Sequence, residues 1–124
     1  MATIRDVMNT SVVTTAPQTP LAQAAAAMVA AGVGSAVVKE GSFLAGIVTE
    51  RDVLRAAASG QDLRDSQVSD WMTADPQSVS PDTAAEDAAQ IMLLNGFRHL
   101  PVMDGRDVCG VVTLRDLFAA RIRR

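Results

Sequence analysis

The 124-residue sequence is poor in the residues that most catalytic and metal sites need. It has one cysteine (Cys109), one histidine (His99), one lysine (Lys39), one tryptophan, three phenylalanines and no tyrosine. A single cysteine excludes an intramolecular disulfide framework and a cysteine-rich zinc site. The scarcity of aromatic rings and the net charge of −3 both argue against a nucleic-acid partner.

Long hydrophobic runs are also missing. The longest apolar run covers residues 24–33, and it is shorter than the about 20 residues that a membrane-spanning helix needs. The first residues contain no apolar segment of the signal-peptide type. With 48% apolar residues the chain can build a core, so we expect a soluble, cytoplasmic protein with no membrane partner.

The chain is an internal repeat. A shift of 64 positions aligns residues 4–60 with residues 68–124 without a gap. Glycines, prolines and a Thr-x-Arg-Asp segment recur in one register, which a biased composition does not produce easily. The sequence therefore predicts two repeats, residues 1–61 and 62–124, that together make one folding unit.

Each repeat shows the pattern helix-strand-helix-strand-strand-helix. The main helices are expected to end at Gly32 and Gly96, because glycine suits a left-handed C-terminal residue. Valine-rich strands are expected at residues 35–39, 44–48, 99–103 and 108–112, with hairpin turns between the members of each pair. Such apolar strands are typical of an α/β fold, and we expect the two repeats to pack about a pseudo-twofold axis.

The starts of the two main helices are predicted from capping signals. Thr19 suits an N-cap with Pro20 at the first helical position. In the second repeat, Thr83 and Glu86 have the spacing of a capping box.

The order of elements and the duplicated motif Gly-x-x-Thr-x-x-Asp, at positions 46–52 and 110–116, resemble a CBS-domain pair, also called a Bateman module. Asp-Val-Met at 6–8, Asp-Trp-Met at 70–72 and His-Leu-Pro-Val at 99–102 add to the resemblance, which spans essentially the whole chain. It implies a regulatory module that binds AMP, ADP or ATP, with S-adenosylmethionine or NAD as further ligands. It also implies a homodimer, and any output would pass to a separate effector protein.

The repeated threonine and aspartate are the main candidate site residues. Thr49 and Thr113 stand where a strand passes into a helix, and unpaired N–H groups and the helix dipole there favour a phosphate. Asp52 and Asp116 follow one turn later, and a carboxylate is a suitable acceptor for two ribose hydroxyls. The same spacing is that of an N-cap with an acidic N3 residue, and both interpretations can hold for one site.

Other candidates are less symmetric between the repeats. Arg98 and His99 suit a phosphate, although a solvated arginine and a structural histidine explain them equally well. Arg51 and Arg115 either touch a phosphate or pair with surface acids. The resemblance implies an aliphatic adenine pocket that includes Val12, Val13, Thr14, Ser35, Ala36, Val37, Val79, Leu100 and Pro101. We expect one of the two sites to dominate.

Two other functions stay open. The same fold can act as a dimerisation or interaction protein with idle nucleotide sites. A small nucleotide hydrolase would need metal-holding carboxylates and a phosphate-binding loop or lysine, and the chain has no Walker-type loop and only Lys39. We therefore expect no enzymatic activity, no catalytic residue, no metal and no required cofactor.

Overall fold

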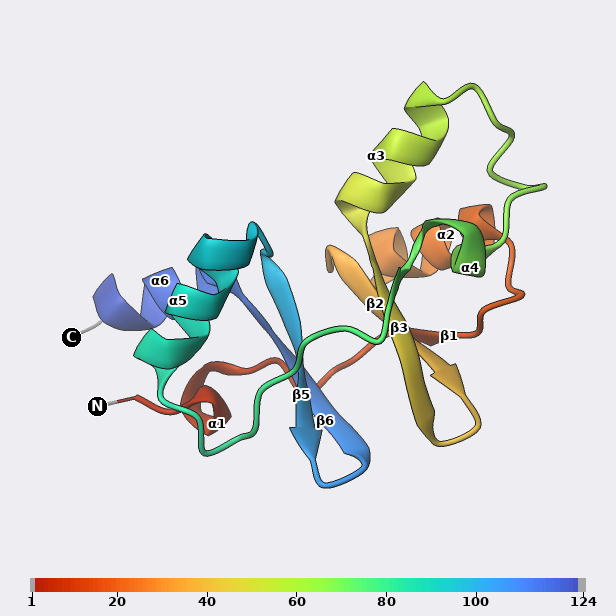
Figure 1. Cartoon of the computed structure of the whole chain (residues 1–124). Coiled ribbons are helices and arrows are strands. Elements are labelled where there is room, and N and C mark those ends of the chain that lie inside the picture. Colours follow the sequence, from red (N-terminus) through yellow and green to blue (C-terminus); the bar gives the residue numbers. More distant parts are fainter. Residues whose placement is uncertain (1, 123–124) are drawn as a thin grey trace. The chain divides into compact units, whose positions relative to one another are not determined.

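The computed structural model describes residues 2–122, which form a mixed α/β protein with the predicted order of elements in each repeat (Figure 1). The first repeat contains α1 (Ile4–Val7), β1 (Thr14–Thr15), α2 (Leu21–Ala31), β2 (Ser35–Glu40), β3 (Phe43–Thr49) and α3 (Glu50–Ala58). The second contains α4 (Val68–Trp71), β4 (Thr73–Ala74), α5 (Ala85–Asn95), β5 (His99–Asp104), β6 (Asp107–Thr113) and α6 (Leu114–Ile122).

The compact units of the structure differ from the sequence repeats. One unit, here called the continuous unit, is Val13–Pro76. The other, here called the split unit, joins the residues up to Val12 to the residues from Gln77 onward. The division into residues 1–61 and 62–124 is thus a division of the sequence, and the opening helix of each repeat packs within the unit built mainly from the other.

The continuous unit contains a four-stranded sheet in the order β1-β2-β3-β4. β1 runs parallel to β2, and the β2–β3 and β3–β4 pairs are antiparallel. The sheet and the helices α2, α3 and α4 enclose a core of apolar side chains: Leu21, Ala24, Met28, Ala36, Val38, Ala45, Val48, Ala56 and Val68.

The split unit has the same plan with shorter flanking strands. β5 and β6 form an antiparallel pair. Single bridges, Val79 with Val102 and Asn9 with Val111, stand where the continuous unit has β1 and β4. Its core contains Ile4, Val79, Ala88, Met92, Leu100, Val102, Val112 and Leu117.

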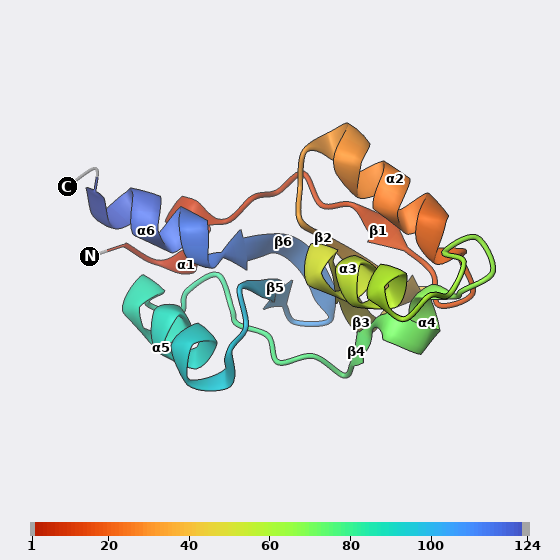
Figure 2. The ribbon, with the colours of Figure 1, turned by 90° about the horizontal axis from the view of Figure 1, so that it is seen from above.

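Helix α1 is attached to the split unit by backbone hydrogen bonds. The amide of Ile4 donates to Thr83 O at 2.9 Å, and the amide of Arg5 donates to Pro81 O at 2.9 Å. Figure 2 shows α1 beside α6, although the two helices lie at opposite ends of the sequence. The fully buried Ile4 side chain completes the contact.

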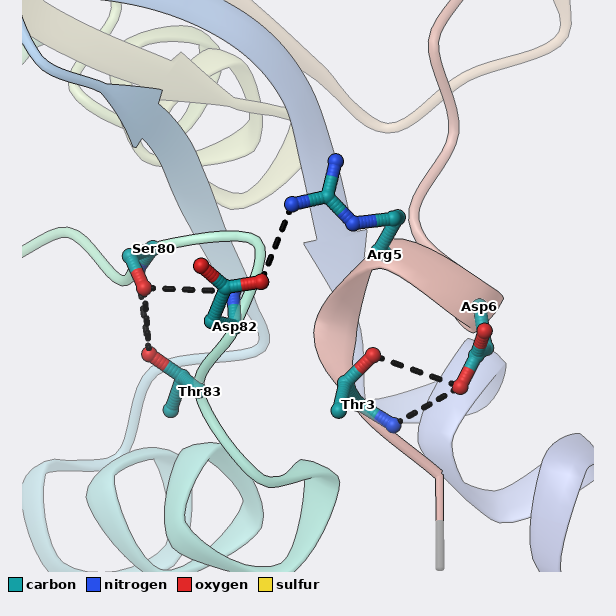
Figure 3. Close-up of polar contacts among 6 residues, drawn as sticks. All are labelled: Thr3, Arg5, Asp6, Ser80, Asp82 and Thr83. Carbon is teal, nitrogen blue, oxygen red and sulfur yellow. Dashed lines mark hydrogen bonds and ion pairs between the residues drawn. The ribbon is translucent and has the colours of Figure 1, made fainter.

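An ion pair adds to this attachment. Arg5 Nη2 lies 2.9 Å from Asp82 Oδ1 (Figure 3), and the hydrogen bond to Asp82 raises the pKa of Arg5. Both side chains are largely exposed, so the pair contributes little to stability. The buried Ile4 is therefore the main anchor of α1.

Helix α4 is attached to the continuous unit by matching bonds. The amide of Val68 donates to Thr19 O at 2.9 Å, and the amide of Ser69 donates to Pro17 O at 2.9 Å. Each of these four residues stands 64 positions from its counterpart around α1. The exchange of opening helices is therefore reciprocal.

The predicted helix starts are wrong by one residue in each repeat. α2 has Pro20 as its N-cap and α5 has Ala84, and neither helix has a side-chain cap. Thr19 and Thr83 are used in the preceding turn, where the Thr19 hydroxyl accepts from the Ala16 amide at 3.3 Å and the Thr83 hydroxyl accepts from the Ser80 amide at 3.1 Å. The threonines stabilise the turn that delivers the chain to the helix, so they are not available as caps. Glu86 is exposed in the first turn of α5.

The predicted helix ends are confirmed. Gly32 and Gly96 are the C-caps of α2 and α5, with φ of 67° and 73°. These left-handed angles are costly for residues with a side chain. The chain can therefore turn directly from each helix into β2 or β5.

Candidate functional site

Thr49 and Asp52 meet where β3 passes into α3. The Thr49 amide donates to Asp52 Oδ2 at 2.9 Å, and the Thr49 hydroxyl donates to the same oxygen at 3.1 Å. The Asp52 amide in turn donates to the Thr49 hydroxyl at 3.4 Å. The pair forms a capping box around the start of the helix.

Thr113 and Asp116 repeat this arrangement where β6 passes into α6. The Thr113 amide donates to Asp116 Oδ2 at 3.1 Å, and the Asp116 amide donates to the Thr113 hydroxyl at 3.0 Å. In both units the motif thus caps its own helix, as the capping interpretation predicts. One carboxylate oxygen of each aspartate, Oδ1, takes no part in the cap.

Few backbone donors remain at either helix start. The Glu50 amide donates to Gly34 O at 2.9 Å, and the Leu114 amide donates to Arg98 O at 3.0 Å. The amides of the threonine and the aspartate also donate hydrogen bonds. The cap does not use the amides of Arg51 and Arg115. A phosphate at either junction would therefore meet one backbone N–H and the exposed arginine side chain that follows it.

The two aspartates differ in their second oxygen. Asp52 Oδ1 accepts from Arg55 Nη1 at 3.2 Å, and the Asp52 side chain is only 11% exposed. The guanidinium of Arg55 also lies over the ring of Trp71, with 5.6 Å from Cζ to the ring centroid. In the split unit, Ala119 stands at the position that corresponds to Arg55.

The hairpin register places a second residue opposite each threonine. Ser35 pairs with Thr49 in the β2–β3 register, and His99 pairs with Thr113 in the β5–β6 register. Ser35 is buried and His99 is half-buried, whereas Arg98 is exposed. The structure thus brings the predicted residue His99 to the strand-helix junction of the split unit.

The segments predicted to hold adenine lie side by side within each unit. Thr14 pairs with Val37, and the Val37 amide donates to Val13 O at 2.9 Å. In the split unit the Val79 amide donates to Pro101 O at 3.1 Å. The residues predicted to contact adenine are Val12, Val13, Thr14, Ser35, Ala36, Val37, Val79, Leu100 and Pro101. Those on β2 and β5 have buried side chains. Val12 and Val13 are half-buried and Thr14 is exposed, so these three are the accessible members of the set.

Sequence reasoning missed Arg55 and Trp71. The contact of Arg55 with Asp52 could have been predicted from the sequence, since an acid and a base three residues apart on a helix lie on the same face. The Trp71 contact had none, because it joins α3 to α4 across the exchange of opening helices.

The comparison with known families decides the identity of the fold. The CBS domain family matches residues 4–59 and residues 68–123. The chain belongs to the CBS-domain family. Its fold is the α/β fold of two tandem CBS repeats, as the resemblance implied.

Known relatives agree with this assignment. An uncharacterized 17.7 kDa protein of Acidianus ambivalens is 42% identical over 123 residues, which cover 97% of this CBS pair and 74% of the relative. A protein with CBS domains from Burkholderia ambifaria is 27% identical, with a TM-score of 0.93 and coverage of 98% of this chain and 95% of its own. CBSX2, solved in complex with AMP, is 26% identical, with a TM-score of 0.83 and coverage of 99% and 98%.

Within residues 2–122, no cluster of three or more His, Cys, Asp or Glu side chains could hold a metal ion. In the same part of the chain, no helix has the length and apolar character needed to cross a membrane.

Proposed function

We propose that this CBS pair is a regulatory module that binds an adenine nucleotide, AMP, ADP or ATP, at the Thr–Asp junctions of α3 and α6. The observation that best supports this proposal is the Thr-x-x-Asp motif, which is present at both strand-helix junctions of a chain in the CBS-domain family. The AMP complex of CBSX2 supports the choice of ligand. S-adenosylmethionine and NAD share the ribose and adenine and are further candidates.

Each part of the nucleotide has a chemical counterpart at the junction. The Oδ1 atom of Asp52 or Asp116 is an acceptor for the ribose hydroxyls. The phosphate would meet the amide and guanidinium of Arg51 or Arg115, with Arg98 and His99 beside the junction of the split unit. The adenine edge would be recognised by the backbone of residues 12–14 or by that around Val79.

We propose that the output passes to a separate effector protein. A ligand changes such an output only by its differential affinity for two states of the module. We further propose a cytoplasmic homodimer as the working form.

Thermal unfolding in the presence of ligands tests the proposal. AMP, ADP, ATP, S-adenosylmethionine and NADH are added separately to the wild type and to Asp52→Asn and Asp116→Asn, which keep an oxygen able to cap the helix. Since only the native state binds, a ligand at about 100 times its Kd stabilises the wild type by about 2.7 kcal/mol. We expect an adenine nucleotide to raise Tm and one of the two substitutions to reduce the rise clearly more than the other.

Each variant is compared with its own ligand-free Tm, so that loss of the cap is not mistaken for loss of binding. No rise in Tm with any of the compounds, in the wild type and in both variants, would refute nucleotide binding.

A second function has its own observation. Both units expose apolar side chains at matching helix positions: Val29 and Leu93, and Leu54 and Phe118, are each at least 65% exposed. Such side chains favour a protein-protein contact. A dimer without any nucleotide response would favour an interaction protein with idle sites.

A further inference from the structure

We propose that Arg55 closes the ribose-binding carboxylate of the continuous unit, so that an adenosyl ligand binds first at Asp116 in the split unit. The inference rests on the proposed function and adds to it which of the two sites is used. It follows from a difference in the contacts of the aspartate at each junction.

The difference lies in the oxygens of the two aspartates. Asp52 has both oxygens engaged, because Oδ2 accepts from the amide and hydroxyl of Thr49 and Oδ1 accepts from Arg55. Asp116 accepts from the Thr113 amide through Oδ2, and its Oδ1 receives no hydrogen bond from the described residues. A ribose diol needs a carboxylate acceptor, so it would have to displace Arg55 from Asp52, whereas no described residue has to leave Oδ1 of Asp116.

Arg55 is held by a second contact. Its guanidinium lies over Trp71, whose ring packs partly buried against the core of the continuous unit. The Nε1 atom of Trp71 is buried and has no hydrogen-bond partner among the described residues, so the ring contributes through its face. An arginine over an aromatic face is attracted by the ring quadrupole, and the ring therefore keeps Arg55 beside Asp52.

The split unit lacks both parts of this closure. Ala119 corresponds to Arg55, and Val7 corresponds to Trp71 at the offset of 64. Neither side chain can donate to Asp116 or stack with a guanidinium. At both junctions the aspartate caps the helix through Oδ2. Its Oδ1 atom is bound by Arg55 in the continuous unit and by no described residue in the split unit.

Calorimetric titration of single-site variants tests the inference. Asp116→Asn leaves the continuous unit as the only site, and Asp52→Asn leaves the split unit. We use 5′-methylthioadenosine, which has the ribose and adenine but no phosphate, and AMP in parallel. We expect the variant with Asp52→Asn to keep the wild-type affinity and the variant with Asp116→Asn to bind about three- to tenfold more weakly.

Removal of the closure should recover the weaker site. Arg55→Ala combined with Asp116→Asn should raise the affinity for 5′-methylthioadenosine about three- to tenfold, the range that partly exposed ion pairs and cation–π contacts span. Arg64→Ala is the matched control, because Arg64 is an exposed arginine paired with Asp62 in the same unit, and it should leave the affinity unchanged.

The reverse substitution tests the same idea in the split unit. Ala119→Arg with Val7→Trp, placed in the Asp52→Asn background, should weaken 5′-methylthioadenosine binding by a similar factor. A ligand-free Tm close to that of Asp52→Asn would show that the two new side chains leave the fold intact.

Three results separate the proposals. Loss of tight binding by Asp52→Asn with retention by Asp116→Asn would overturn the inference and leave the proposed function standing. Weaker AMP binding by Arg55→Ala, with 5′-methylthioadenosine unaffected, would make Arg55 a phosphate ligand and also overturn it. No binding of either compound by the wild type or by any variant would refute the proposed function itself.

Discussion

Gly46 and Gly110 occupy matching positions in β3 and β6, where another segment of the chain comes very close. A Cβ atom on Gly46 would lie 2.7 Å from Thr73 O and 2.8 Å from the sulfur of Met72. A Cβ atom on Gly110 would lie 2.9 Å from both Asn9 O and the sulfur of Met8. The backbone oxygens cannot withdraw as a side chain can, so each glycine is required by the segment that the other repeat contributes.

We therefore predict that Gly46→Ala and Gly110→Ala each lower the free energy of unfolding by about 1–3 kcal/mol, as overpacking does in a filled core. Urea denaturation measures the loss. Ser42→Ala, at an exposed turn position of the same β2–β3 hairpin, should change it by less than about 0.5 kcal/mol. A wild-type free energy of unfolding in both glycine variants would contradict the close approach of the two segments.

Single residues also show what the sequence can and cannot predict. Gly32 and Gly96 were placed correctly because a left-handed helix end depends on local backbone geometry. Thr19 and Thr83 were misplaced because two local uses of a threonine hydroxyl compete, and the sequence does not show which one the preceding turn takes. For Asp52 and Asp116, capping was predictable from spacing, whereas the contact of Arg55 with Trp71 depends on tertiary packing.

At the scale of helices and strands, the reciprocal exchange of α1 and α4 determines which substitutions affect which unit. Ile4 lies in the first repeat but in the core of the split unit, and Val68 lies in the second repeat but in the core of the continuous unit. Both side chains are fully buried. Truncation of either side chain should therefore destabilise segments that are distant from it in the sequence.

We predict that Ile4→Ala destabilises the split unit by about 2–5 kcal/mol, the usual cost of truncating a large buried aliphatic side chain. Hydrogen exchange should show the largest loss of amide protection in β5 and β6, with β2 and β3 less affected. Val68→Ala should give the opposite pattern. Val29→Ala serves as the control, because Val29 is 81% exposed.

A loss of protection confined to β2 and β3 after Ile4→Ala would contradict the exchange. It would mean that α1 packs within its own sequence repeat.

The elements themselves were largely predictable, and their grouping was not. Apolar strand runs and glycine turns indicate the two hairpins, because both signals are local. Nothing in the spacing of α1 or α4 shows which repeat they pack against, since the opening segments of the two repeats carry nearly equivalent apolar residues. Long-range backbone bonds, such as those of Ile4 and Val68, distinguish the two arrangements.

At the scale of the whole molecule, the exposed apolar residues of α3 and α6 bear on assembly. Leu54 is 70% exposed and Phe118 is 65% exposed, and they occupy matching positions in the repeat. We predict that Leu54→Glu with Phe118→Glu converts the proposed homodimer to a monomer while the Tm of the fold changes little, because neither side chain belongs to a core cluster.

Sedimentation velocity measures the assembly state, and circular dichroism measures the fold. Gln90→Glu, which adds one negative charge at an exposed position of α5, is the control. A dimer that survives the double substitution would show that these two residues do not form its interface.

The exchange also has a consequence for any attempt to divide the protein. Scission between residues 61 and 62 would leave two peptides, and each compact unit needs stretches from both of them. The halves should then be poorly structured alone and regain structure when mixed. Cuts after residues 12 and 76 would instead release residues 13–76 as one peptide that carries every segment of its own unit.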